Sequence, residues 1–144
     1  MQQNNVLINL EGISFKYSDG PLVLNELNFK LQRGNRIGLI APNGSGKTTL
    51  LHIIMGLLKP LSGKLEIFGR PVGEEKDFVD VRRRIGLLFQ DADDQLFSPT
   101  VLEDVAFGPL NLGKSKGDAV SIARDTLQAL GLAGFEDRVT FKLS

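Results

Sequence analysis

Residues 41–48 combine glycines, a lysine and a threonine at the spacing of a phosphate-binding loop, and they read Ala41-Pro42-Asn43-Gly44-Ser45-Gly46-Lys47-Thr48. The pattern Gly-x-x-x-x-Gly-Lys-(Ser/Thr) is met at every position except the first, where Ala41 replaces glycine. Such a loop turns several backbone N–H groups toward one anion, and the helix that follows aims its positive end at the same point. The pattern therefore predicts a site for the phosphates of a nucleotide.

Each part of this phosphate loop (residues 41–48) has a chemical task. Gly44 and Gly46 permit the unusual backbone dihedral angles and the close approach that phosphate oxygens require. Lys47 brings a positive charge to the β- and γ-phosphates, and the Thr48 hydroxyl can ligate Mg²⁺. Ala41 fits this scheme if its φ is negative, as at the exit of a strand. The alternative is a chance glycine-rich turn, which the flanking elements disfavour.

The loop is flanked by an apolar run and an amphipathic segment. Residues 37–41 form a short continuous apolar run, which is typical of a strand buried on both faces of a parallel sheet. Beyond the loop, Lys59-Pro60 should end a largely buried helix. Its apolar positions recur with helical spacing at Leu50, Ile53, Ile54, Leu57 and Leu58, and Leu51 and Met55 widen the apolar surface.

The N-terminal third is predicted to be an antiparallel, half-exposed pair of strands. Apolar residues alternate over residues 6–17, and the alternation changes phase at Glu11-Gly12, which indicates a bulge or a break. Residues 18–21 have the composition of a turn, and residues 22–31 return as a second strand with an irregularity near Asn25-Glu26. Two further strands are predicted at residues 65–68 and 84–89, the latter buried.

The C-terminal third is predicted to be helical from Val101 onward. Residues 115–118 have the composition of a helix N-terminus, and Gly131 is a natural stop. Together with the strand, loop and helix around the phosphate loop, these elements indicate an α/β fold. One stripe of the last helix is expected to be buried, and it consists of Ala119, Ile122, Ala123, Thr126, Leu127 and Leu130.

Composition and charge exclude several function classes. The 144 residues include 17 basic and 17 acidic side chains, so no strong nucleic-acid or membrane-surface partner is expected. The first 72 residues hold eight basic and four acidic residues, which places any anion-binding role there. The absence of cysteine and the single histidine exclude disulfides, a thiolate nucleophile and a multi-histidine metal centre. With no secretory signal and no apolar stretch near the roughly 20 residues of a membrane span, a cytoplasmic location is expected.

The chain resembles the ATP-binding subunits of ABC transporters, and within them the cobalt/nickel-type energy-coupling-factor ATPases. Residues 13–72, 82–113 and 137–144 carry this resemblance, which runs from about residue 6 to the last residue. It implies a phosphate-loop NTPase core with an antiparallel β flank and a partial helical subdomain. It also implies ATP and Mg²⁺ as cofactors, with Thr49 joining the nucleotide-binding residues of the phosphate loop.

Two residues outside the loop take roles from this resemblance. Tyr17 matches the aromatic residue that stacks on the adenine ring, and the alternative is a strand-end aromatic side chain at a sheet margin. Gln90 matches the glutamine that senses Mg²⁺ and the γ-phosphate, so Thr48 and Gln90 are the implied Mg²⁺ ligands. Residues 93–97 match the segment that faces the membrane partner.

The resemblance divides the chain at residue 90 and ends within a motif. Residues 1–90 would be the N-terminal part of the nucleotide-binding core, and residues 91–144 a partial helical subdomain. The signature motif of the family begins at Leu143-Ser144, so the sequence is expected to be a truncated N-terminal part. The acidic catalytic strand and the switch histidine would lie beyond it, which leaves no complete catalytic site.

The function that the resemblance implies is that of an ATP-binding, energy-coupling subunit of an importer, with a metal ion such as cobalt or nickel as the solute. Its partners would be a transmembrane subunit and a second ATP-binding subunit. It would lie at the inner face of the cell membrane without inserting into it. One alternative is a non-catalytic nucleotide-binding fragment. Another is a small phosphate-loop kinase, which the acidic residues after Gln90 disfavour.

Two charged clusters have competing interpretations. Asp91, Asp93 and Asp94 could suggest a metal site, but their spacing lacks a supporting ligand set and a solvated loop is predicted. Residues 82–84 are three arginines that could suggest a nucleic-acid patch. The chain has zero net charge and few aromatic residues between its basic ones, which disfavours a nucleic-acid patch. These arginines are therefore predicted to be a charged entry, that is, charged residues at the start of the strand predicted at residues 84–89.

These 144 residues alone are predicted to turn over no ATP, although weak Mg·ATP binding can survive. Hydrolysis needs a positioned water and a Mg²⁺ ion held by several oxygen ligands, and the loss of several cooperating groups leaves little catalysis. Steady-state phosphate release by the purified 144-residue protein should equal that of the buffer. Turnover that co-purifies with the protein and disappears in Lys47→Ala would contradict this expectation.

Overall fold

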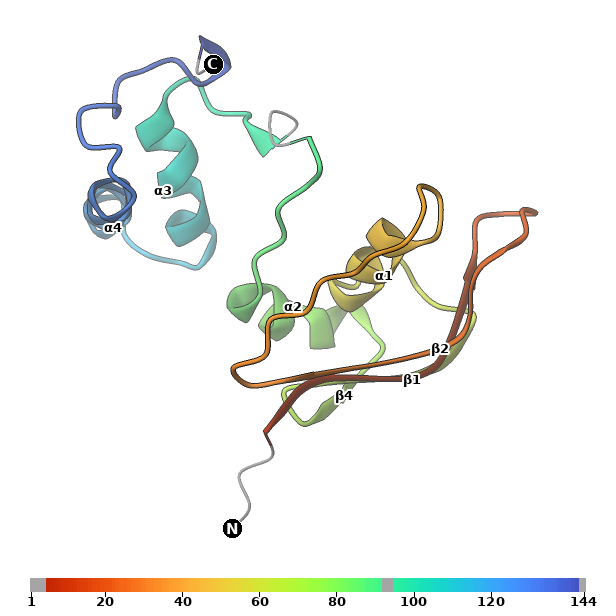
Figure 1. Ribbon diagram of the computed structural model, residues 1–144. Helices are drawn as coiled ribbons and strands as arrows, with labels where there is room; N and C mark the ends of the chain where they lie inside the picture. The colour runs from red at the N-terminus through yellow and green to blue at the C-terminus, as the bar shows by residue number, and fades with distance from the viewer. Residues whose placement is uncertain (1–4, 92–94, 143–144) are drawn as a thin grey trace. The chain divides into compact units, whose positions relative to one another are not determined.

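The computed structural model describes residues 5–91 and 95–142, which fall into two compact units, Met1–Leu87 and Leu88–Ser144. The first unit contains a four-stranded antiparallel sheet and two helices, and the second contains two helices and a 3₁₀ turn (Figure 1). This content confirms the predicted α/β class with an antiparallel flank. Within the described ranges, no helix is both long enough and apolar enough to cross a bilayer.

The sheet of the first unit has the strand order β2-β1-β3-β4. Strand β1 (Val6–Lys16) lies between β2 (Leu22–Gln32) and β3 (Ser62–Ile67), and the short β4 (Arg70–Val72) pairs with β3. All neighbouring strands are antiparallel. The strand predicted at residues 65–68 is confirmed over residues 65–67 as part of β3, and Phe68 lies in the turn that follows. The two N-terminal strands are confirmed as β1 and β2.

The predicted change of phase in the alternation of apolar residues in β1 corresponds to a β-bulge. The pairing register shifts between Leu10 and Ile13, and Gly12 there has a φ of +62°. Without an extra residue, Leu10 and Ile13 would point to opposite faces of the sheet. The bulge lets the apolar residues on both sides of it enter one core. In β2 the expected irregularity is also confirmed, because Glu26 has a φ of +48° between two shifted pairs.

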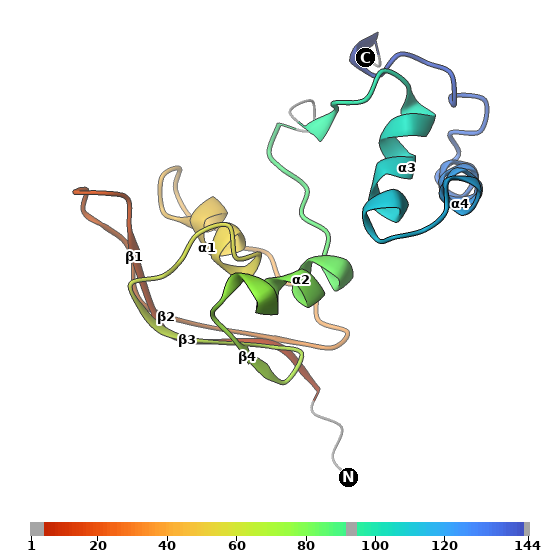
Figure 2. The ribbon, with the colours of Figure 1, turned by 180° about the vertical axis from the view of Figure 1, so that it is seen from behind.

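Helices α1 (Lys47–Ile54) and α2 (Glu75–Arg84) cover one face of this sheet (Figures 1 and 2). Their apolar side chains pack on those of the strands and form the main core of the first unit. Burial of this core is the dominant favourable contribution to the stability of the unit. Its buried members are Ile8, Leu10, Ile13, Phe15, Leu24, Leu50, Ile53, Ile54, Leu65, Ile67, Phe78 and Val81.

Helix α2 was not predicted from the sequence, although its N-terminus carries a recognisable signal. The side chains of Glu74 and Asp77 form a reciprocal capping box with the backbone. Hydrogen bonds from the backbone N–H groups of Glu74 and Gly73 lower the pKa of Asp77. The interpretation of residues 82–84 as a charged entry to a strand is wrong, because these arginines form the last turn of α2.

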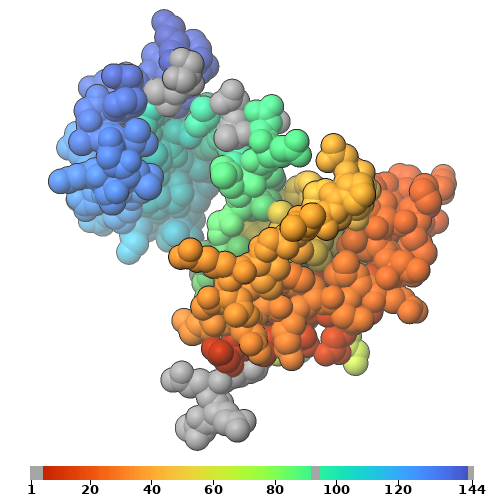
Figure 3. All heavy atoms as spheres, viewed as in Figure 1, coloured from red at the N-terminus to blue at the C-terminus, as the bar shows by residue number. Residues whose placement is uncertain are grey.

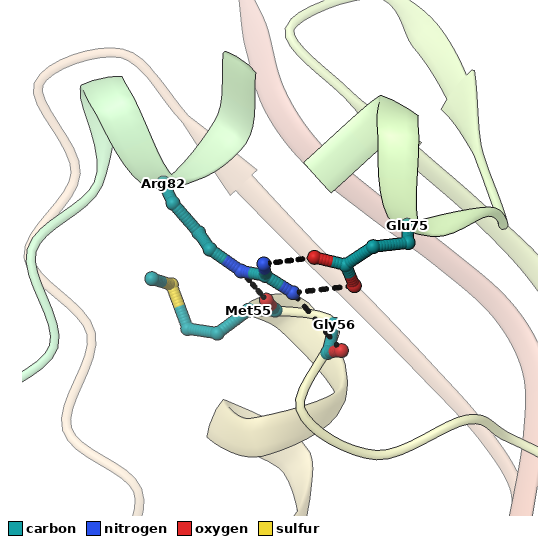
Figure 4. A network of polar contacts seen from close by, with 4 residues as sticks. All are labelled: Met55, Gly56, Glu75 and Arg82. Carbon is teal, nitrogen blue, oxygen red and sulfur yellow. Dashed lines mark hydrogen bonds and ion pairs between the residues drawn. The ribbon is translucent and has the colours of Figure 1, made fainter. Parts of the chain in front are cut away.

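Arg82 joins α2 to the end of α1 (Figure 4). Its guanidinium donates to both carboxylate oxygens of Glu75, with Nη2 lying 3.0 Å from Oε2. It also donates from Nε to the carbonyl oxygen of Met55 at 3.0 Å and from Nη2 to that of Gly56 at 3.2 Å. The hydrogen bond from Arg82 lowers the pKa of Glu75. Arg82 thus satisfies two carbonyl groups at the C-terminus of α1.

Helix α1 ends earlier than the apolar pattern predicts. The helix stops at Ile54, and Gly56 adopts a left-handed φ of +68°. The ring of Phe78 packs against Gly56 so closely that a Cβ atom there would lie 2.3 Å from Cγ of Phe78. The chain therefore turns away at Gly56, and Leu51 and Leu57 are exposed rather than buried.

Residues 37–41 and 84–89, predicted as buried strands, are not strands, and Arg84 is instead the last residue of α2. Ile40 is 99% exposed and Leu88 is 77% exposed. A strand forms only where a neighbouring strand receives its hydrogen bonds. Among the described residues the sheet has four members, and neither segment pairs with any of them.

The second unit is built on helices α3 (Val101–Asn111) and α4 (Lys116–Ala129), followed by the 3₁₀ turn η2 (Thr140–Lys142). The predicted start of α4 is confirmed, since the Ser115 hydroxyl accepts a hydrogen bond from the N–H of Asp118. The helices pack through a small core of Ala106, Ala119 and Ala123. The buried stripe is narrower than predicted, because only Ala119, Ala123 and Leu127 are buried, whereas Ile122, Thr126 and Leu130 are exposed. Gly131, with a φ of +73°, follows the end of α4 as expected.

Gly56→Ala should destabilise the protein by about 2–4 kcal/mol, because a left-handed φ disfavours alanine and the added methyl group overlaps Phe78. The measurement is the free energy of unfolding from urea denaturation followed by circular dichroism. Gly73→Ala is the matched control, since Gly73 has no atom within 4 Å of its Cβ position and no left-handed φ. Equal stability of the two variants would refute this account of the end of α1.

Candidate phosphate-binding site

The phosphate loop leads directly into the N-terminus of α1. Gly44 has a φ of +79° and Gly46 a φ of +90°, so both predicted glycine positions adopt conformations that other residues rarely accept. Ala41 is not among the described non-glycine residues with positive φ, which meets the condition set for alanine at this position. The segment between β2 and α1, orange to gold in Figure 3, runs along the surface of the first unit.

The N-terminus of α1 lacks a side-chain cap. Gly46 is the N-cap residue, and no side chain accepts a hydrogen bond from the first turn. The N–H groups of that turn have no carbonyl partner four residues earlier in the helix, and they carry the positive end of the helix dipole. No acidic residue lies in the first turn to offset this charge. The helix start is therefore suited to an external anion.

Gly46 lies against β2. A Cβ atom at this position would be 2.8 Å from Leu24 Cδ2, 3.0 Å from Val23 Cγ1 and 3.2 Å from the carbonyl oxygen of Val23. Any other residue would force these side chains or α1 to shift, and it would also have to adopt the left-handed φ of +90°. Val23 and Leu24 therefore position the loop, a role that the sequence analysis did not identify. The only sequence signal for it is the glycine itself.

Lys47 extends its side chain back across the loop. Its Nζ donates hydrogen bonds to the carbonyl oxygens of Ala41 at 2.7 Å and Pro42 at 2.8 Å. The N–H of Ser45 also donates to the Pro42 oxygen, at 3.3 Å. The ammonium group thus lies over the loop and in contact with its backbone. Phosphate oxygens at this place would form stronger, charge-assisted hydrogen bonds with the same group.

The two threonines after Lys47 have different environments. Thr48 is exposed, so its hydroxyl can reach a solvated cation such as Mg²⁺. Thr49 is buried, and its Oγ1 lies 3.0 Å from the phenolic oxygen of Tyr17 in a hydrogen bond. Tyr17 is 49% exposed, and its ring makes an edge contact with Phe15 at a centroid distance of 4.9 Å. The structure thus brings Tyr17 to the helix of the phosphate loop.

The other predicted site residues belong to the second unit or fall outside the described residues. Gln90 and Asp91 are exposed residues of the second unit, so a role of Gln90 toward Mg²⁺ stays a prediction. Asp93 and Asp94 fall outside the described residues, and so do Leu143 and Ser144 at the expected start of the signature motif.

A cavity in the first unit is separate from the phosphate loop. It has a volume of about 720 Å³ and lies between β3, α2 and the segment that follows α1. Its lining residues come mainly from residues 56–66 and 71–75, with Asn9, Glu11 and Phe78, and none belongs to residues 41–49. The candidate phosphate site is therefore an exposed loop and helix end rather than an enclosed pocket.

The residues present fit a nucleoside triphosphate with Mg²⁺. The uncapped N–H groups and Lys47 offer donors and positive charge to phosphate oxygens. Thr48 offers one hard oxygen ligand for the cation, and Tyr17 offers an exposed aromatic surface for a base. Bound Mg²⁺ would neutralise phosphate charge and organise the phosphate oxygens.

Comparison with known proteins gives consistent matches. A sequence profile of the family described as ABC transporter matches residues 24–144. Over 139 residues the chain is 43% identical to the energy-coupling factor transporter ATP-binding protein EcfA of Methanocaldococcus jannaschii, covering 96% of this chain and 50% of that protein. It is 42% identical over 139 residues to the cobalt import ATP-binding protein CbiO of Rhodobacter capsulatus, with the same two coverages. The chain thus spans about half the length of the curated relatives that it matches.

A solved structure supports the fold assignment. The structure of cbiO1 from Clostridium perfringens, described as part of the ABC transporter complex cbiONQ, superposes with a TM-score of 0.83. The two sequences are 34% identical, and the match covers 98% of this chain and 57% of that one. The chain therefore has the fold found in part of that protein.

Tyr17→Ala should weaken the binding of ATP and ADP by the same factor, about 5- to 100-fold, because stacking on a base does not depend on the γ-phosphate. Isothermal titration with each nucleotide in the presence of Mg²⁺ measures the two dissociation constants. A selective loss of ATP binding would contradict the role of Tyr17 as a platform for the base.

Proposed function

Because the chain belongs to the ABC transporter family, we propose that it binds Mg·ATP as the nucleotide-binding part of an energy-coupling ATPase of an importer. The observation that carries this proposal is the uncapped N-terminus of α1 together with the ammonium group of Lys47, which bonds the backbone of the same loop. A helix start without acidic residues, next to a positive charge, attracts an anion of high charge. The matches to ATP-binding proteins support a nucleotide as this anion.

In the proposed site each residue has a defined task. The backbone N–H groups of the phosphate loop and the Nζ of Lys47 bind the phosphates, and Thr48 ligates Mg²⁺. Tyr17 stacks on the adenine ring, and Gln90 of the second unit contacts Mg²⁺ and the γ-phosphate in the assembled protein. Lys47 exchanges its bonds to the Ala41 and Pro42 carbonyls for bonds to phosphate oxygens, which are stronger because both partners are charged. Thr49 is buried and forms a hydrogen bond with Tyr17.

The two units take different parts in this proposal. The first unit provides the nucleotide-binding core, and the second provides part of a helical subdomain that faces a transmembrane partner. A second ATP-binding subunit completes the assembly, which lies on the cytoplasmic side of the membrane. For the solute we propose a metal ion such as cobalt or nickel, and the similarity to the cobalt import protein of Rhodobacter capsulatus supports a metal ion.

A non-catalytic nucleotide-binding role is the alternative, and it makes the same use of the phosphate loop. The two functions differ only in ATP turnover, so an ATPase assay of the protein with and without an added full-length relative separates them. Stimulated turnover that depends on Lys47 supports the energy-coupling role. Nucleotide binding without any turnover in either mixture supports the non-catalytic role.

Lys47→Ala should weaken Mg·ATP binding by about 10- to 100-fold, because it removes a charge-assisted hydrogen bond to the phosphates. Lys142→Ala is the matched control, since Lys142 is an exposed lysine in η2 of the second unit. Both dissociation constants are measured by titration with Mg·ATP at one salt concentration. Equal effects of the two substitutions would remove the phosphate-loop assignment.

A further inference from the structure

We propose that Thr49 is a positioning residue for Tyr17, whose ring it holds as a preformed platform for the nucleotide base. The inference rests on the proposed function, because it concerns the same nucleotide site. It starts from one hydrogen bond, between Thr49 Oγ1 and the phenolic oxygen of Tyr17, which lie 3.0 Å apart. This bond joins the end of β1 to the first turn of α1 across 32 residues of sequence.

Two contacts hold the Tyr17 ring. The ring packs edge to face with Phe15, with an interplanar angle of 88° and a centroid distance of 4.9 Å. At the tip, the hydroxyl forms the hydrogen bond to Thr49. Tyr17 is nevertheless about half exposed, which leaves aromatic surface for a base. A ring that is held by two contacts and is still accessible is suited to stacking.

Thr49 is itself a rigid anchor. Its side chain is buried at 4% exposure, and a β-branched side chain in a helix has few rotamers. Gly46, in the turn before it, is pressed against Val23 and Leu24 of β2. Leu24 pairs with Phe15 across the two strands. The same end of the β1–β2 pair therefore contacts the phosphate loop at Gly46 and the Tyr17 platform at Phe15.

This arrangement sets the separation between the base platform and the phosphate-binding N–H groups before a nucleotide arrives. A free tyrosine side chain would lose rotational freedom when a base stacks on it, and a side chain that is already fixed loses less. The gain from such preorganisation is about two- to tenfold in the dissociation constant. Preorganisation of Tyr17 should lower the dissociation constant of nucleotides and leave that of ligands without a base unchanged.

The test removes the hydrogen bond between Tyr17 and Thr49 by substituting one partner or the other. Thr49→Val keeps the shape of the buried side chain, and Tyr17→Phe keeps the aromatic ring. Each variant should bind Mg·ATP about two- to tenfold more weakly, and the double variant should be no weaker than either single one. Binding of Mg·tripolyphosphate, which has no base, should stay unchanged in all three. Thr126→Val is the matched control, because it removes a threonine hydroxyl that bonds only within α4.

A second readout follows Tyr17 directly. The chain contains one tyrosine and no tryptophan, so its intrinsic tyrosine fluorescence reports Tyr17 alone. Without nucleotide, Thr49→Val should lower the fluorescence anisotropy of Tyr17, because the ring is freed at its tip, and Thr126→Val should not. Circular dichroism shows that each variant is folded, and Tyr17→Phe tests the same bond if Thr49→Val fails to fold.

Three results would overturn the inference and leave the proposed function intact. The first is wild-type affinity of Thr49→Val and Tyr17→Phe for Mg·ATP. The second is an equal loss of ATP and tripolyphosphate binding in Thr49→Val, which would mean that Thr49 contacts the phosphates itself. The third is additive losses in the double variant, which would mean that the residues act independently. Failure of the wild-type protein to bind Mg·ATP would overturn the proposed function and the inference together.

Discussion

The contact between Gly46 and β2 determines where the phosphate loop lies. There is no room for a Cβ atom between this glycine and the side chains of Val23 and Leu24, so the start of α1 is pressed onto the sheet. The direction of the uncapped N–H groups follows from that position, and so does the reach of Thr49 toward Tyr17. Thus β1 and β2, whose strand residues supply no predicted phosphate ligand, set the geometry of the site.

The other end of α1 is held in a comparable way. An eight-residue helix is marginally stable by itself, so it depends on tertiary contacts. At Gly56 the chain turns in a left-handed conformation against the ring of Phe78, and Arg82 bonds the carbonyl groups of Met55 and Gly56. Glu75 fixes the guanidinium group in turn (Figure 4). The sheet therefore holds the N-terminus of α1, which follows the phosphate loop, and α2 holds its C-terminus.

Features that depend on neighbouring residues were predictable from the sequence, whereas features that depend on distant partners were not. The glycine conformations of the phosphate loop, the bulge at Gly12 and the Ser115 cap follow from local chemistry. Residues 37–41 have the composition of a buried strand, but a strand also needs a hydrogen-bonding neighbour, which composition cannot specify. The Tyr17–Thr49 bond joins residues too far apart in sequence for a spacing rule to reveal.

The central claim is that an anion of nucleotide type binds at the start of α1. The most direct measurement is a ¹⁵N-edited NMR titration of the protein with Mg·ATP, which reports each backbone amide separately. The account predicts the largest shifts at the amides of residues 44–49, with a further shift at Tyr17. Shifts concentrated instead on residues 56–66, which line the cavity of about 720 Å³, would contradict it and place the ligand elsewhere.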